Sequence, residues 1–300
     1  MLEYATGVLD VLEKNIFDKQ DMERMITASS KEEAFKVLFD TDLGETASKE
    51  SRIEVILEKD LEGLKEILFK MLRDTKIELF YFLFLKFDAL NLKIVLKEKE
   101  GISFNSSLVP FERLKMFSQD NSALGNKYVE KMARETFLLT GSIDERVDTA
   151  CLKTKLLLAK KIKGLPLDIT KFEIDIANLK NLIKEKHGFI EGGNLSHSDM
   201  LKLLGKKRGM ISKGLEKFLE AFDLSLLIED FEKTGSESDL EKGLEKFLSN
   251  RILQKEREGG GMEKVMGFFT RKINAHSNIR LIFFQKDSGI ENIEKNLLPI

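Results

Sequence analysis

Apolar residues recur at spacings of three and four along almost the whole chain, and the strict alternation typical of strands is scarce. This period gathers apolar side chains on one face of a helix, so it predicts amphipathic helices packed against a common core. Long helices are expected over residues 48–73, 76–99, 143–163, 167–187, 237–254 and 262–286, with shorter ones between them. The predicted fold class is all-α.

Helix-capping residues and helix-breaking segments interrupt this pattern. At three expected helix starts a serine stands three residues before a glutamate, as in a capping box, in which the hydroxyl and the carboxylate satisfy the free N–H groups of a helix start. These pairs are Ser30 with Glu33, Ser142 with Glu145, and Ser238 with Glu241. Breaks at 101–110, 188–194 and 234–236 predict domain boundaries near residues 105 and 190. The interval 191–235 gives the weakest helical signal.

A segment of the second long helix returns later in the chain. Residues 88–99 read Asp-Ala-Leu-Asn-Leu-Lys-Ile-Val-Leu-Lys-Glu-Lys, and residues 175–186 read Asp-Ile-Ala-Asn-Leu-Lys-Asn-Leu-Ile-Lys-Glu-Lys. A weaker third copy keeps Asn278-Ile279-Arg280 but has Ala275 in place of the acid. Each copy lies in the second of two long helices, so the repeating unit is a helical hairpin with shorter helices attached. Three such units are predicted, covering residues 1–104, 105–190 and 191–300.

The repeated polar positions are the candidate site. They are Asp88, Asn91 and Lys93, then Asp175, Asn178 and Lys180, and finally Asn278 and Arg280. An aspartate and an asparagine three residues apart share one helix face, where they can bond to each other or to unsatisfied backbone groups of a neighbouring loop or helix end. We therefore expect a structural role. The alternative, a proton relay or cation site of the intramembrane kind, is disfavoured because a lysine stands close to each pair.

Charge and composition narrow the classes of partner and location. The chain has 49 basic and 51 acidic residues, so no overall positive field attracts a nucleic-acid backbone. Hydrophobic residues at 42% and charged residues at 33% are typical of a soluble globular protein. The first residues lack the basic and apolar regions of a signal peptide, and Cys151 is the one cysteine, so we expect a cytosolic, reducing location.

The most apolar stretch, residues 77–96, is close to the roughly 20 residues that span a bilayer. Its uncharged core covers only residues 79–85. The charged residues that interrupt the stretch are Glu78, Lys86, Asp88 and Lys93. Each charge at bilayer depth costs roughly 2.5–3.5 kcal/mol. We therefore expect a buried helix of a soluble bundle and no transmembrane segment.

Motifs that carry enzyme chemistry are absent from the sequence. It contains no phosphate-binding loop, no dinucleotide-binding glycine pattern and no nucleophile elbow. His187, His197 and His276 lack the helical partners of common metal sites. Cys151 is expected to be a small buried residue rather than a nucleophile. We expect no catalytic residue, no cofactor and no metal.

With its repeats, the chain resembles the C subunit of archaeal- and bacterial-type V/A-ATPases, the relative of subunit d in vacuolar ATPases. Residues 32–41 are similar to the family's early short helices, although Leu43 stands where the family has a tyrosine. Residues 80–99 are similar to its long helix with Asp-x-x-Asn-Leu and a basic residue. Residues 143–180 are similar to its middle repeat, and residues 268–297 to its terminal Asn-Ile-Arg helix and tail helix.

This resemblance implies a non-catalytic rotor subunit whose three similar helical bundles form a pseudo-threefold funnel. Its implied place is the cytosolic face of a membrane, between the proteolipid ring and the D- and F-type subunits of the central shaft. There it would link ATP hydrolysis or synthesis to proton or sodium transport. Two other classes stay open: a free-standing helical scaffold that binds proteins, and an all-α enzyme with an unfamiliar site.

Overall fold

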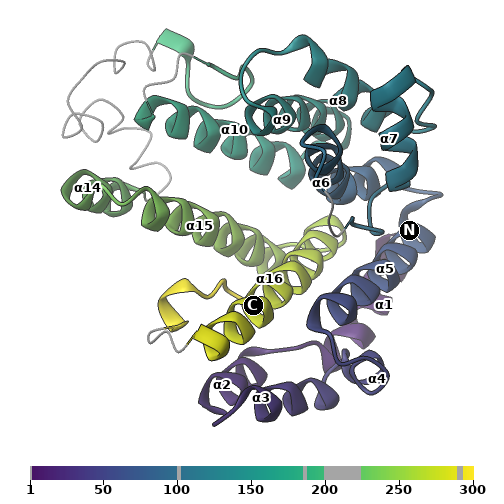
Figure 1. The fold of residues 1–300 in the computed structure, drawn as a ribbon, viewed down its shortest axis with the longest axis vertical. Helices are drawn as coiled ribbons and strands as arrows, with labels where there is room; N and C mark the ends of the chain where they lie inside the picture. The colour runs from purple at the N-terminus through teal and green to yellow at the C-terminus, as the bar shows by residue number, and fades with distance from the viewer. Residues whose placement is uncertain (1, 100–102, 185–187, 199–223, 289–292) are drawn as a thin grey trace. The chain divides into compact units, whose positions relative to one another are not determined.

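The computed structural model describes residues 2–99, 103–184, 188–198, 224–288 and 293–300 (Figure 1). Every regular element in these ranges is a helix, which confirms the predicted all-α class. The first α-helices are α1 (Leu2–Leu12), α2 (Lys19–Thr27), α3 (Lys31–Val37), α4 (Gly44–Ala47), α5 (Ile53–Leu72), α6 (Ile77–Leu96) and α7 (Phe111–Asp120). They are followed by α8 (Lys127–Leu138), α9 (Ile143–Ile162), α10 (Leu165–Ile183), α14 (Ser225–Thr234), α15 (Glu237–Glu258) and α16 (Met262–Ser288). Short 3-10 helices are η1 (Glu13–Asn15), η2 (Leu38–Asp40) and η4 (Ile293–Asn296).

Two compact units make up the chain. The larger contains residues 1–154 and 249–300, and the smaller contains residues 155–248. The boundaries fall inside α9 and α15. The three expected repeats, 1–104, 105–190 and 191–300, divide the chain differently and stay a prediction. Residues 199–223, which form most of the weakly helical interval 191–235, lie outside the described residues.

The six long helices expected from the apolar period are all present, as α5, α6, α9, α10, α15 and α16. Their ends follow local backbone chemistry. The helix α10 starts at Leu165, earlier than expected, because Gly164 adopts a positive φ of 59° that ends the preceding turn. Pro166 then fits the first helical turn, where its missing N–H has no partner to lose.

Two of the expected capping boxes mark helix starts. Ser142 and Glu145 form the complete reciprocal pair before α9, with bonds of 2.9 and 3.3 Å. At α3, Ser30 accepts the N–H of Glu33 as expected, at 3.2 Å. The Glu33 carboxylate, however, reaches back to Ser29 rather than to Ser30. The pattern therefore locates both starts correctly.

The third capping box was predicted at the wrong serine. The helix α15 begins at Glu237, so Ser238 lies inside it. Ser236 is the residue that caps the helix, because its hydroxyl accepts the Asp239 N–H at 3.3 Å. Gly235, just before it, ends α14 in the left-handed conformation with a φ of 71°.

The core of the larger unit joins the two ends of the chain. Met25 of α2, Leu38 of η2 and Ile56 of α5 belong to one apolar cluster with Ile279 and Ile282 of α16. All five side chains are fully buried. Burial of an aliphatic side chain contributes about 1.5–3 kcal/mol. This cluster therefore holds the N-terminal helices against the C-terminal one.

The core of the smaller unit is built on α10. Phe172 and Leu179 of this helix share a cluster with Ile228 of α14 and Leu244 of α15. The ring of Phe172 also lies 5.0 Å from the ring of Phe247, measured between centroids. The helices α14 and α15 therefore both pack on α10.

A charged cluster lies between α16 and α5 in the larger unit. The Nζ of Lys272, whose side chain is 5% exposed, lies 2.6 Å from Oδ2 of both Asp42 and Asp60. Burial would raise the pKa of Asp60, but Lys272 and a hydrogen bond from His276 hold it at about 2. Burial would lower the pKa of Lys272, but the two carboxylates raise it above its ordinary value. Asp60 is therefore ionised and Lys272 protonated at neutral pH.

His276 is the neutral member of this charged cluster. Its ring is buried, Nε2 lies 2.6 Å from Oδ2 of Asp60, and Nδ1 has no hydrogen-bond partner among the described residues. Since Asp60 is ionised, Nε2 carries the proton and donates it. A second proton on Nδ1 would place an unsatisfied donor in the interior beside the charge of Lys272. Burial and that neighbouring charge lower the pKa of His276 below its ordinary value.

We expect His276 to make the protein less stable as the pH falls below about 6.5, the ordinary histidine pKa. In that pH range His276 takes up a proton in the unfolded chain but stays neutral in the folded chain. The free energy of unfolding therefore falls by up to about 1.4 kcal/mol per pH unit. His276→Gln keeps a donor for Asp60 but cannot titrate. Urea unfolding of the wild-type protein and His276→Gln from pH 5 to 8 should show a difference in the free energy of unfolding that changes with pH. Titration of the other groups is common to both proteins and cancels in this difference. A constant difference would contradict this account.

Candidate functional site

The three copies of the repeated motif lie in three long helices. The helices are α6, α10 and α16, each the second of a long pair (α5–α6, α9–α10 and α15–α16), as Figure 1 labels them. The aspartates and asparagines of the motif are 1% exposed or less: Asp88, Asn91, Asp175, Asn178 and Asn278. Buried polar groups require hydrogen-bond partners. Those partners define what the motif does.

Each motif asparagine bonds to both backbone groups of a single residue that follows its helix. In the first copy, Nδ2 of Asn91 donates to the carbonyl oxygen of Phe104 at 2.9 Å, and Oδ1 accepts the Phe104 N–H at 2.8 Å. The same two bonds, again at 2.9 and 2.8 Å, join two further pairs: Asn178 with Ile190, and Asn278 with Leu298. We call each pair a latch. The side-chain amide suits it because it offers a donor and an acceptor side by side.

The aspartate of the first copy holds the backbone a few residues beyond the latch. The two oxygens of Asp88 accept the N–H groups of Leu108 at 2.8 Å and Val109 at 2.9 Å. Nearby, Nζ of Lys65 donates to the carbonyl oxygen of Ser107. Burial raises the pKa of Asp88 to about 7, against the opposing effect of these N–H groups and of Lys65. Its carboxyl therefore titrates near neutral pH.

The aspartate of the second copy repeats this arrangement. Asp175 accepts the N–H groups of Asn194 at 2.8 Å and Leu195 at 2.9 Å. The backbone passes so close that a Cβ at Gly193 would lie 2.1 Å from Oδ1 of Asp175, so only glycine fits there. Burial raises the pKa of Asp175 as well.

The third copy holds its following segment without the acid. Ala275 stands in the aspartate position and offers no side-chain acceptor. The neighbouring residue takes over a tie to the backbone, because Nδ2 of Asn274 donates to the carbonyl oxygen of Pro299 at 2.7 Å. Together with the latch from Asn278 to Leu298, this bond fixes the last residues of the chain on α16.

The basic residue of each copy pairs with an acid on the first helix of another helix pair. The Nζ of Lys93 lies 2.6 Å from Asp148 of α9. The other two ion pairs are Lys180 with Glu241 of α15 at 3.3 Å, and Arg280 with Glu54 of α5 at 2.8 Å. In order, these contacts join α6 to α9, α10 to α15, and α16 back to α5. All six side chains are partly exposed, so each pair contributes at most about 1 kcal/mol.

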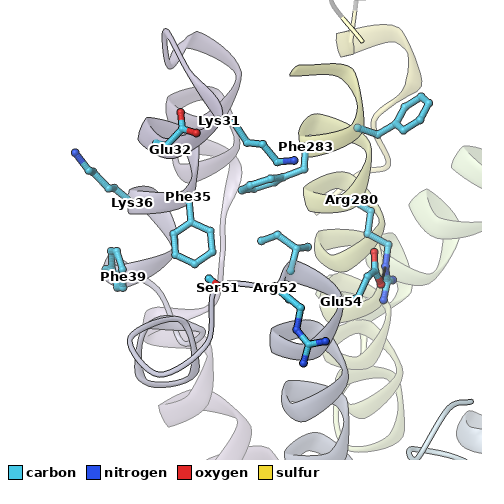
Figure 2. A pocket seen from close by; sticks show the side chains of 12 residues that line it. Lys31, Glu32, Phe35, Lys36, Phe39, Ser51, Arg52, Glu54, Arg280 and Phe283 are labelled. Atoms are coloured by element: carbon cyan, nitrogen blue, oxygen red, sulfur yellow. Dashed lines mark hydrogen bonds and ion pairs between the residues drawn. The ribbon is translucent and has the colours of Figure 1, made fainter. Parts of the chain in front are cut away.

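An aromatic groove of about 800 Å³ lies between α3, the start of α5 and α16, all in the larger unit (Figure 2). Its apolar lining is Phe35, Phe39, Ile53, Phe283 and Phe284, and its charged lining is Lys31, Glu32, Lys36, Arg52, Glu54 and Arg280. The rings of Phe39 and Phe284 are 45% and 64% exposed. The motif residue Arg280 and its partner Glu54 therefore also form part of a surface concavity.

A family model described as ATP synthase (C/AC39) subunit matches residues 5–295 of the chain. The chain belongs to this family. The match confirms the resemblance that the repeats and the four passages indicated, and it identifies the chain as a rotor-associated structural subunit of a V/A-type rotary ATPase. No curated protein matches the sequence.

The described residues contain no cluster of three or more histidine, cysteine, aspartate or glutamate residues able to hold a metal ion. Cys151 is half-buried, His197 stacks on Phe189, and His276 belongs to the charged cluster. His187 lies outside the described residues. None of the helices in the described part of the chain combines the length and apolar character needed to cross a bilayer.

Sequence reasoning located the motif of this subunit but missed the acids that pair with its basic residues. Glu54, Asp148 and Glu241 each lie within the first two turns of a long helix. Acids are common there because they complement the helix dipole, so the signal was present but not specific. The aromatic groove was missed because it brings together residues from opposite ends of the chain.

Breaking a latch should destabilise the unit that contains it. In Asn91→Asp and Asn178→Asp the side chain can no longer donate to the carbonyl oxygen of Phe104 or Ile190, and a charge is buried instead. We expect a loss of about 3 kcal/mol in the free energy of unfolding for each variant. Asn250→Asp, on the exposed part of α15, is the matched control and should change it by less than about 0.5 kcal/mol. Equal stability of latch and control variants in urea unfolding would refute the role.

Asp88 should leave a pH signature of the opposite sign to that of His276. Because the folded pKa of about 7 exceeds the ordinary value of 3.8, the folded chain keeps a proton that the unfolded chain releases. The stability of the wild-type protein relative to Asp88→Asn should therefore decline as the pH rises from 4 to 7. Urea unfolding at several pH values measures this difference. A relative stability that increases with pH would show that the ionised carboxylate is the favoured form.

Proposed function

We propose that this C/AC39 subunit couples the rotor of a V/A-type ATPase. In this proposal it sits on the cytosolic face of the membrane as a peripheral subunit and holds the D- and F-type shaft subunits on the proteolipid ring. ATP hydrolysis or synthesis in the head is thereby linked to proton or sodium transport. The observation that carries the proposal is the family match over residues 5–295.

The contacts of the repeated motif support such a mechanical part. A subunit that transmits torque must resist sliding between its helices, and close-packed cores with satisfied polar groups transmit strain rather than absorb it. Each latch ties the segment after a helix to that helix through two hydrogen bonds. The proposed function requires a rigid body, and the three latches restrict movement of the segments that they hold.

The order of the ion pairs supports three related units in a pseudo-threefold funnel. Lys93, Lys180 and Arg280 occupy the same motif position and reach α9, α15 and α5 respectively. A cyclic order in which the last repeat returns to the first is what a closed arrangement of three repeats requires. We therefore keep 1–104, 105–190 and 191–300 as the proposed repeats.

The interfaces with shaft and ring are expected to be of the permanent kind, larger than about 2,000 Å² in total, with apolar centres and charged rims. The alternative function is a free-standing scaffold that binds other proteins. Co-purification separates the two: a rotor subunit should come down with shaft and ring subunits from membranes solubilised in mild detergent, whereas a scaffold should not.

Deletion of the subunit should uncouple the ATPase. ATP hydrolysis by the head should persist, because the catalytic sites lie elsewhere, while ATP-driven ion uptake into inverted membrane vesicles should be lost. Hydrolysis rate and ion uptake are measured on the same vesicles, and the wild-type gene on a plasmid serves as the control that restores uptake. Normal ion uptake in the deletion strain would overturn the assignment.

A further inference from the structure

The aromatic groove of the larger unit has the features of a protein docking site. One wall is α3 with the following η2, and the other is α16; Figure 2 shows Phe35 and Phe39 on the first wall and Phe283 on the second. Phe35 contacts Phe39 and Phe283 edge to face, at centroid distances of 5.7 and 6.3 Å. These contacts fix a continuous aromatic floor. Aromatic residues, phenylalanine among them, are enriched at protein interfaces relative to the rest of the surface.

Positive charge surrounds this floor. The cations on the groove are Lys31, Lys36, Arg52 and Arg280, against the two carboxylates of Glu32 and Glu54. Glu54 and Arg280 compensate each other at 2.8 Å, and Arg52 lies 3.5 Å from Glu50, just outside the lining. Among the other charges of the lining, Lys31 and Lys36 stand against Glu32, so the groove carries a small excess of positive charge on a chain whose overall charge is −2. A partner that complements it must be acidic where it meets the rim.

The shape favours a helix as the occupant. A trough between two helix walls accepts a third helix, whose apolar face meets the floor through residues spaced at i, i+3, i+4 and i+7. The rim then pairs with acids that flank the apolar face of the helix.

We propose that the aromatic groove binds an acidic amphipathic helix of another protein, with Phe39 and Phe284 as anchors and Lys36 and Arg52 as charge partners. This site is additional to the coupling role and does not rest on it. Phe39 and Phe284 are 45% and 64% exposed in the structure, so their removal leaves the core unchanged.

The test uses the full-length protein and labelled synthetic helices of roughly 18 residues, or about five turns. One peptide carries leucines at i, i+3, i+4 and i+7 with glutamates on its flanks, and the other carries lysines in place of the glutamates. Fluorescence anisotropy should show micromolar binding of the acidic peptide and at least about tenfold weaker binding of the basic one. No binding of the acidic peptide below about 1 mM, or equal binding of both, overturns the proposal.

Variants locate the binding. The double variant Phe39→Ser with Phe284→Ser should weaken binding of the acidic peptide by about tenfold or more. The double variant Lys36→Glu with Arg52→Glu should also weaken this binding, by an amount that depends on the salt concentration. Phe137→Ser is the matched control, because Phe137 is 46% exposed but lies on α8, away from the groove lining. Circular dichroism confirms that each variant is folded. Equal loss in Phe137→Ser would overturn the assignment to the groove.

Two further measurements separate other occupants. Co-sedimentation with phosphatidylglycerol vesicles that is abolished by the groove variants would assign the groove to a membrane surface. A dimer in light scattering that the same variants dissolve would assign it to a second copy of the chain. Either result overturns the proposal. A protein that is monomeric and does not co-sediment with the vesicles, while it binds the acidic peptide, supports it. The ATPase coupling measurement is independent of this test. A wild-type protein that supports ion uptake but does not bind the acidic peptide would refute the groove proposal and leave the coupling role unaffected.

Discussion

A buried asparagine that bonds to both backbone groups of one residue answers a problem that every helical protein has. A helix satisfies its own backbone, but the segment that follows it carries N–H and C=O groups that apolar contacts cannot satisfy. Asn91, Asn178 and Asn278 offer the paired donor and acceptor that a neighbouring strand would offer in a sheet. The backbone of the following segment can then be buried against its own helix. The latches therefore fix the segments around Phe104, Ile190 and Leu298 on the helices that precede them.

The aspartates show how this constraint is adjusted from copy to copy. Asp88 and Asp175 each accept two consecutive backbone N–H groups. The third copy has Ala275 instead and ties down the chain end with Asn274. In the first two copies, burial raises the pKa of the aspartate carboxyl. In the third copy the side chain that bonds to the backbone is a neutral amide, so no charge has to be desolvated. The tie to the backbone is kept while its chemistry changes.

The sequence supports the fold class, the six long helices and the motif positions, because each depends on local spacing. It does not reveal the latch partners, since Phe104, Ile190 and Leu298 take part through their backbone, and any residue type with a backbone N–H could make these bonds. The wrong cap at Ser238 has a similar cause: Ser236 and Ser238, two residues apart, each stand three residues before an acid and so fit the same rule. The charged cluster and the aromatic groove unite distant parts of the chain, for which a single sequence carries no spacing signal.

The ion pairs and the apolar cores divide the work of holding the helix pairs together. Apolar clusters supply most of the stability, because their side chains interdigitate at high density. The pairs made by Lys93, Lys180 and Arg280 are weak individually, but they are directional. Two of them belong to ladders of charges that recur each turn, since Lys93 also lies 3.9 Å from Asp144, and Lys184 lies 3.5 Å from Glu237 and 3.6 Å from Glu241. Such ladders oppose displacements smaller than one turn, about 5.4 Å, and leave the choice between whole-turn registers to the packing of the apolar clusters. The proposed coupling role would use both contributions.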